Sequence, residues 1–262
     1  MSKQEKENKK NALVGTIIFH AILVFLLTLP FAALTAGILG FFIGLCSLRV
    51  RHDFLAITTM GVGFLFVGVV RQQDFLGGEV GISGIPSPGF SRLWFLVFCL
   101  FLASLFAFFS LRIKESWMGK VFESISDDED VTKSLGINVS HYKIFAFVIG
   151  TSVAGVAGAL YAHHLRFIGP DSFGFVESVS VLAMVIIGGV GSVWAVSATA
   201  AFLSVLPMVF QFVDDYKLLF YSALLFLMMR FSPEGLKGLV ETIKKKRKSK
   251  LDKENKNEQK AS

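Results

Sequence analysis

Long apolar segments constrain this chain more than any other feature of its sequence. The clearest runs from Leu93 to Ile113, and its 21 residues would span roughly 30 Å as a helix, close to the hydrocarbon thickness of a bilayer. Trp94 and Trp117 flank it, as aromatic residues do at membrane interfaces. Hydrophobic residues make up 53% of the chain, more than a soluble domain usually tolerates. We therefore expect an all-α, multi-pass transmembrane helical bundle.

The charged residues suggest how the chain is oriented. The net charge of +6 does not indicate nucleic-acid binding, because Lys and Arg gather in tails that flank the apolar segments, as cytoplasmic charges do. We expect residues 1–11 to form a charged cytoplasmic leader and residues 12–231 the transmembrane domain. Residues 232–262 are expected to form a Lys-rich, disordered cytoplasmic tail.

The number of crossings depends on how the apolar segments break. Residues 12–48 exceed the roughly 20 residues needed for one span, so we expect two short helices that turn near Pro30. One long tilted helix is the alternative. Further spans are expected at 54–70, 93–113, 142–162, 176–187, 196–213 and 218–231. About eight crossings would place both termini in the cytoplasm, whereas seven would place the N-terminus outside.

Small residues recur every fourth position in two of these segments, which predicts faces where helices approach closely. For the first segment, loose small-residue content without a packing role is the alternative. The first stripe comprises Ala32, Ala36, Gly40 and Gly44; the second comprises Gly150, Ala154, Gly158 and Ala162, with Gly155 and Ala159 beside it.

Two glycine-rich segments are candidate pathway elements. Residues 71–92 are expected to form an outside loop, or to lie against protein, because lipid would leave its backbone groups unsatisfied. The second segment interrupts the apolar run after residue 187, and a plain helix turn is the alternative reading. The candidate residues are Gly77, Gly78, Gly81, Ser83 and Gly84 in the first segment, and Gly188, Gly189, Gly191 and Ser192 in the second.

Metal binding and disulfide formation are not expected. His163 and His164 are adjacent, so on a helix they point about 100° apart, and no Cys, Asp or Glu nearby completes a ligand set. Cys46 and Cys99 both lie inside apolar segments, as buried small hydrophobic residues do.

A short acidic helix is expected within a cytoplasmic loop at residues 114–141. Ser126 and Glu129 match a capping box, and the acidic residues from Asp127 to Asp130 suit a helix N-terminus. Gly136 supplies a C-terminal stop. A helix of about nine residues is too short to stand alone in water, so Val131 and Leu135 are expected to dock it. Its own protein and another subunit are equally good candidates for the docking surface.

The chain resembles the membrane permease subunits of branched-chain amino acid ABC importers. The resemblance is carried by LRVRHDFLAITTMGVG, GGEVGISGIP, the stretch from DDEDVTKSLGINVSHYKIF to FIGPDSF, LAMVIIGGVGSVW and RFSPEGLKGL, in that order. It covers roughly residues 45–239, and glycine-rich spans that usually precede this part in the family are missing. The family's loop turn pair is replaced by Glu79 and Val80, so the preferred solute could differ.

The resemblance implies a transport subunit that is not an enzyme. It implies a second related permease, two cytoplasmic ATPases that bind ATP, an external solute-binding protein and a bacterial-type inner membrane. No phosphate-binding G-x-x-x-x-G-K-[ST] motif occurs in the sequence, and no cofactor is expected in this chain. Permeation of another small solute (amide, urea-like, sugar or nucleoside) and ion-driven secondary transport are the alternatives. The residues implied to couple to the ATPases are Asp128, Glu129, Asp130, Val131, Leu135 and Gly136.

Overall fold

The computed structural model describes residues 3–47, 52–87, 89, 91–209, 216–231, 235 and 238. Most of the tail predicted at 232–262 lies outside these residues. The chain divides into two compact units, residues 1–172 and 173–262, which are described separately.

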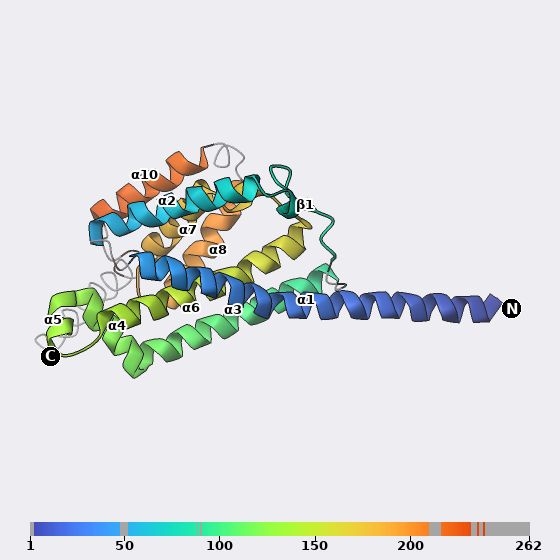
Figure 1. Ribbon diagram of the computed structural model, residues 1–262, viewed down its shortest axis with the longest axis horizontal. Helices are drawn as coiled ribbons and strands as arrows, with labels where there is room; N and C mark the ends of the chain where they lie inside the picture. The colour runs from blue at the N-terminus through green and yellow to red at the C-terminus, as the bar shows by residue number, and fades with distance from the viewer. Residues whose placement is uncertain are drawn as a thin grey trace, which may run out of the picture. The chain divides into compact units, whose positions relative to one another are not determined.

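Helices dominate the first unit (Figure 1). Its elements in order are α1 (Lys3–Ser47), α2 (His52–Arg71), the 3-10 helix η1 (Asp74–Leu76), β1 (Ile82–Ser83), α3 (Arg92–Glu115), α4 (Trp117–Asp127), α5 (Glu129–Ser134), α6 (Val139–Leu165) and β2 (Phe167–Ile168). The helices α2, α3 and α6 confirm the segments predicted at 54–70, 93–113 and 142–162. The all-α class is confirmed, since β1 and β2 contain two residues each.

The predicted turn near Pro30 is wrong, and the alternative of one long helix is correct. Helix α1 continues for 45 residues with Pro30 inside it. Proline removes one backbone hydrogen bond, which a helix in an apolar environment tolerates when its neighbours hold it on both sides. Here Phe25 and Leu29 before the proline and Ala32 and Ala33 after it belong to the same packed cluster.

Helices α1 and α6 run antiparallel and form the centre of this unit. Phe25 lies against His163 near one end, and Gly40 lies against Thr151 further along. The closest approach is at Gly155, where a Cβ atom would overlap the Ala32 carbonyl oxygen and lie 2.6 Å from Ala36 Cβ. The small-residue face predicted on α1 is thus confirmed as a packing face.

The packed face of α6 is offset from the stripe predicted there. Val156 and Ala159 are buried against α1, together with Phe25 and Leu29. No described atom lies within 4 Å of a Cβ built on Gly150, and Ala154 is exposed, while Gly158 and Ala162 are half-buried. Helix α3 completes the cluster with partly buried Phe95, Phe98, Leu102 and Phe106.

The second unit contains α7 (Phe175–Gly188), α8 (Val193–Val209) and α10 (Lys217–Phe231). These confirm apolar helices close to the last three predicted spans. Ala183, Ile187, Leu203 and Tyr221 form its buried core. The Tyr221 hydroxyl donates a hydrogen bond of 3.0 Å to the Leu203 carbonyl.

That hydrogen bond compensates for a proline. In an α-helix the Leu203 carbonyl would accept from the N–H of residue 207, but Pro207 has no N–H. Tyr221 in α10 supplies the missing donor, so the buried carbonyl in α8 is satisfied.

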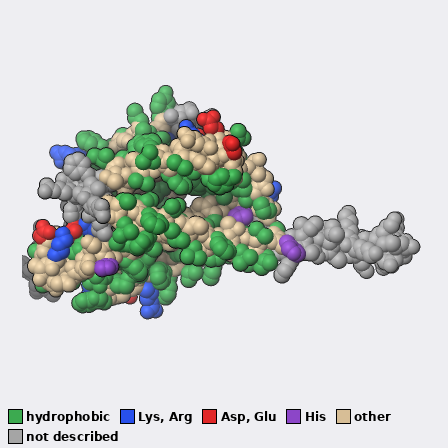
Figure 2. Space-filling model, in the orientation of Figure 1, with side chains coloured by type: hydrophobic (Ala, Val, Ile, Leu, Met, Phe, Trp, Pro, Cys, Tyr) green, Lys and Arg blue, Asp and Glu red, His purple; other side chains and the backbone are tan. Residues whose placement is uncertain are grey.

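Four described helices are long and apolar enough to cross a membrane, within His20–Cys46, Arg92–Glu115, Val139–Leu165 and Pro170–Gly188. Ile57–Arg71 and Val193–Val209 are shorter apolar helices. Hydrophobic side chains are spread widely over the described residues on the visible face (Figure 2). The apolar helices define a multi-pass membrane protein, while the exact number of crossings stays a prediction.

Candidate functional site

Helix α4, which was not predicted from the sequence, supports the short acidic helix. Helix α4 has one apolar face, on which Val121 is buried. The chain turns at Asp128, whose backbone is extended and separates α4 from α5. One Asp128 carboxylate oxygen, Oδ1, accepts hydrogen bonds from the N–H groups of Asp130 (2.9 Å) and Val131 (3.0 Å). The predicted Ser126–Glu129 capping box is therefore wrong: Ser126 lies in α4, and Asp128 caps α5.

Thr132 docks α5 onto its own protein. Its side chain is fully buried, and its Oγ1 lies 2.7 Å from the Asp128 carbonyl oxygen and 2.9 Å from the Ser124 carbonyl oxygen. Ser124 Oγ lies 2.8 Å from the same hydroxyl. The predicted docking residues, Val131 and Leu135, are instead 56% and 70% exposed. They leave an apolar surface on the outer side of α5.

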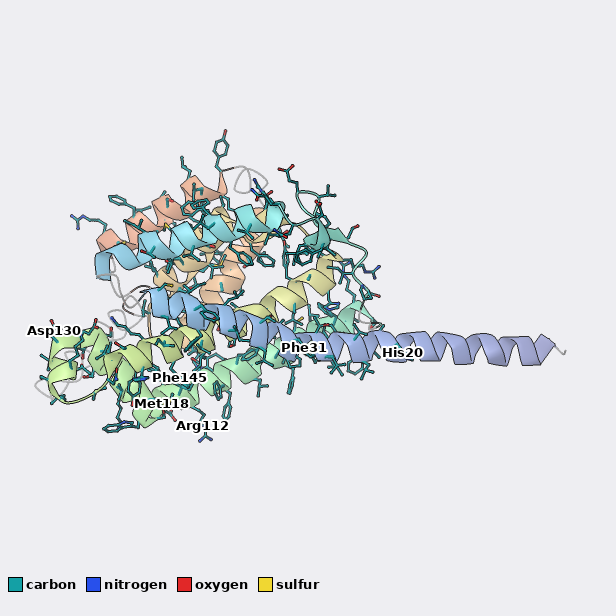
Figure 3. All side chains as sticks on the ribbon, viewed as in Figure 1. His20, Phe31, Arg112, Met118, Asp130 and Phe145 are labelled. Carbon is teal, nitrogen blue, oxygen red and sulfur yellow. The ribbon has the colours of Figure 1, made fainter. Side chains whose placement is uncertain are left out.

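Ion pairs hold the other side of α5. The Glu129 side chain is 14% exposed; its Oε2 lies 2.6 Å from Lys143 Nζ in α6, and its Oε1 lies 3.2 Å from Lys133 Nζ. The hydrogen bond to Glu129 raises the pKa of Lys133 above its ordinary value. The Asp130 side chain is 94% exposed, and α5 lies at the end of this unit opposite His20 (Figure 3).

Gly136 ends the acidic helix, as predicted. Its φ is +80°, a conformation that favours glycine, and its N–H donates to the Lys133 carbonyl oxygen (3.0 Å). Helix α6 begins shortly afterwards with Asn138 as its cap, since Asn138 Oδ1 accepts from the N–H of His141.

The glycine-rich loop lies against its own chain at the other end of α6. Strand β1 pairs antiparallel with β2, with Ile82 opposite Ile168 and Ser83 opposite Phe167. A Cβ atom on Gly81 would overlap the Ile168 carbonyl oxygen, so only glycine fits this approach. Gly77, Gly78 and Gly84 also have positive φ.

Two side-chain contacts fix this pairing. Arg71 at the end of α2 forms an ion pair with Asp171. His163 is buried, and its Nδ1 lies 3.0 Å from the Pro86 carbonyl oxygen. His164 stacks on Phe95 instead. Among the residues that the structure describes, no three His, Cys, Asp or Glu side chains gather to hold a metal ion.

The second glycine-rich segment is a tight turn between α7 and α8. Gly189 and Gly191 have positive φ, and a Cβ on Gly188 would lie 2.6 Å from Val196 Cα. Gly235 packs directly on Gly189. This geometry corresponds to the helix-turn alternative considered for residues 188–192.

These features define the class of the protein. It is a multi-pass helical membrane protein in which a short helix, α5, lies beyond the end of the packed helices and is held there by hydrogen bonds and ion pairs. The family model described as "Branched-chain amino acid transport system / permease component" matches residues 11–229, and the chain belongs to that family.

Curated relatives are permease proteins. The chain is 34% identical to the high-affinity branched-chain amino acid transport system permease protein LivM of Escherichia coli K12, and 33% identical to LivM of Salmonella typhimurium LT2. Each match covers 79% of this chain and 56% of the relative, so the chain spans about half the length of these proteins. It is also 28% identical to the permease protein LivH of Salmonella typhimurium, over 74% of this chain and 61% of the relative. No solved structure gives a significant match.

Proposed function

We propose that this chain is a permease subunit of an ATP-driven importer in a bacterial-type inner membrane. It forms part of the pathway for branched-chain or other hydrophobic amino acids, as the names of its relatives suggest. The observation that carries the proposal is α5, which is docked through Thr132 and Glu129 while Val131 and Leu135 face outward. Such an apolar, solvent-facing pair on an otherwise polar helix suits contact with an ATPase subunit.

The proposal includes partners that this chain needs. Two cytoplasmic ATPases bind the ATP, since the sequence has no nucleotide-binding loop. The chain matches both LivM and LivH, so a second related permease is expected to pair with it. An external solute-binding protein delivers the solute. The test is purification in mild detergent with the associated subunits, followed by ATP-dependent uptake of radiolabelled leucine into vesicles that contain the complex. Loss of the ATPase from the complex, or uptake that is independent of ATP, would contradict the proposal.

Leu135→Asp is expected to lower recovery of the ATPase with this chain at least tenfold. A charge in an apolar contact leaves an unpaired carboxylate on complex formation, and residues at an interface centre are worth roughly 1–4 kcal/mol or more. Co-purification measured by quantitative immunoblotting checks this prediction.

The matched control is Leu135→Met, which keeps the apolar side chain and is expected to keep the complex. Equal recovery of the ATPase with both variants would rule out this surface as the contact.

The proposal also fixes the orientation of α1. Because α1 is one helix antiparallel to α6, its N-terminal part lies at the end opposite α5 (Figures 1 and 3). With α5 in the cytoplasm, His20 faces the outside, so this proposal follows the seven-crossing alternative and replaces the expectation that residues 1–11 lie in the cytoplasm. In a variant with Cys46→Ser and Cys99→Ser, we expect a membrane-impermeant maleimide to label His20→Cys in intact cells but to label Leu135→Cys only after permeabilisation.

The reverse labelling pattern would place α5 outside and contradict the orientation. If residues 12–48 crossed the membrane twice, residue 20 would lie in hydrocarbon, and His20→Cys would remain unlabelled from either side.

A further inference from the structure

Helix α5 is joined directly to α6 by two routes, and indirectly through α4, whose Phe122 ring lies 6.0 Å from the Tyr142 ring of α6. The backbone route runs through residues 135–138, which include Gly136 at φ +80°. No described atom lies within 4 Å of a Cβ built on Gly136, so no neighbouring group packs against this glycine, and backbone hydrogen bonds such as that from its N–H to the Lys133 carbonyl oxygen (3.0 Å) hold the turn. The side-chain route is the ion pair between Glu129 and Lys143, which spans 14 residues of sequence.

The ion pair links the start of α5 to the first turns of α6. Glu129 is the first residue of α5, and Lys143 lies one turn into α6. Their charged atoms are 2.6 Å apart, and the two side chains are 14% and 31% exposed, so salt screens this pair less than a fully exposed one. Thr132 fixes α5 to α4 but does not reach α6 through any hydrogen bond that the described residues show.

We propose that Glu129 and Lys143 are positioning residues that make α6 follow α5. This inference rests on the proposed function, in which an ATPase displaces α5. When the pair is intact, α5 and the first turns of α6 move as one body. When it is broken, the ATPase still docks on Val131 and Leu135, but the turn at Gly136, against which no neighbouring group packs, absorbs the displacement.

The test measures ATP hydrolysed per solute imported, using the purified complex in vesicles. Lys143→Met is expected to raise this ratio about tenfold while leaving assembly with the ATPase unchanged, and Glu129→Gln is expected to raise the ratio as well. The swap Glu129→Lys with Lys143→Glu is expected to restore coupling only in part. The restoration is incomplete because a positive charge at the start of α5 opposes the helix dipole and lies near Lys133.

Lys133→Met is the matched control. Lys133 contacts the same Glu129 carboxylate but belongs to α5, so its loss does not disconnect α5 from α6. We expect a wild-type ratio for this variant. Thermal stability in detergent is measured for every variant, so that coupling is compared only among folded complexes.

The outcomes separate the inference from the proposed function. A wild-type complex that imports nothing with ATP contradicts the proposed function. If wild type imports, then a wild-type ratio in Lys143→Met and Glu129→Gln overturns the positioning role. An equally raised ratio in Lys133→Met, or no restoration by the swap, also overturns it, because the pair would then only stabilise α5.

Discussion

Gly155→Leu is expected to prevent accumulation of folded protein in the membrane. The new Cβ would overlap the Ala32 carbonyl oxygen and lie 2.6 Å from Ala36 Cβ, and neither group can move away as a flexible side chain end would. Overpacking costs about 1–3 kcal/mol at sites that can adjust. Here the whole of α1 would have to separate from α6, and close packing is what associates helices in a membrane.

Gly150→Leu is the matched control on the same helix. Position 150 is open among the described residues, so the larger side chain is expected to leave the yield of monodisperse protein on size-exclusion chromatography unchanged. A normal yield and a normal thermal midpoint for Gly155→Leu would show that α1 and α6 do not pack as described.

Tyr221→Phe is expected to destabilise the second unit by about 1–3 kcal/mol, because the buried Leu203 carbonyl would lose its donor. The reason lies in Pro207, which lacks the N–H that would otherwise serve this carbonyl. The effect should therefore depend on the proline. In a Pro207→Ala background the alanine N–H can bind the Leu203 carbonyl, and Tyr221→Phe should cost less than half as much.

Thermal midpoints of wild type, both single variants and the double variant give the coupling between the two positions. Additive effects would mean that the tyrosine hydroxyl does not replace the missing amide. If Tyr221→Phe destabilised the protein more in the Pro207→Ala background than in wild type, the hydroxyl would likewise not replace the missing amide.

The sequence predicted the elements that depend on composition. The segment 93–113 became α3 and the segment 54–70 became α2, because about 20 apolar residues between charged ends leave few alternatives. The acidic helix and its stop at Gly136 followed from dipole and backbone preferences that act locally.

The features that depend on contacts between helices could not be predicted from the sequence. Gly150 and Gly155 both belong to small-residue patterns, and only the register against α1 distinguishes them. A proline usually ends a helix, and Pro30 does not, because α6 and α3 hold both sides of it. Val131 and Leu135 were expected to face inward, but Thr132 could satisfy its hydroxyl on Ser124 and took that position. The hydrogen bond from Thr132 to the Ser124 carbonyl oxygen spans eight residues, and it can be recognised only once α4 is known to lie beside α5.

Helix α6 connects the two polar regions of its unit without interruption. It carries Lys143 near its first turn and leads directly into β2, which pairs with β1. Its 27 residues make it about 40 Å long, so a tilt of about 5° around one end displaces the other by about 3.5 Å. That displacement exceeds the length of a hydrogen bond. A change of a few degrees beside Glu129 would therefore displace β2 at the far end by more than the distance over which a hydrogen bond forms.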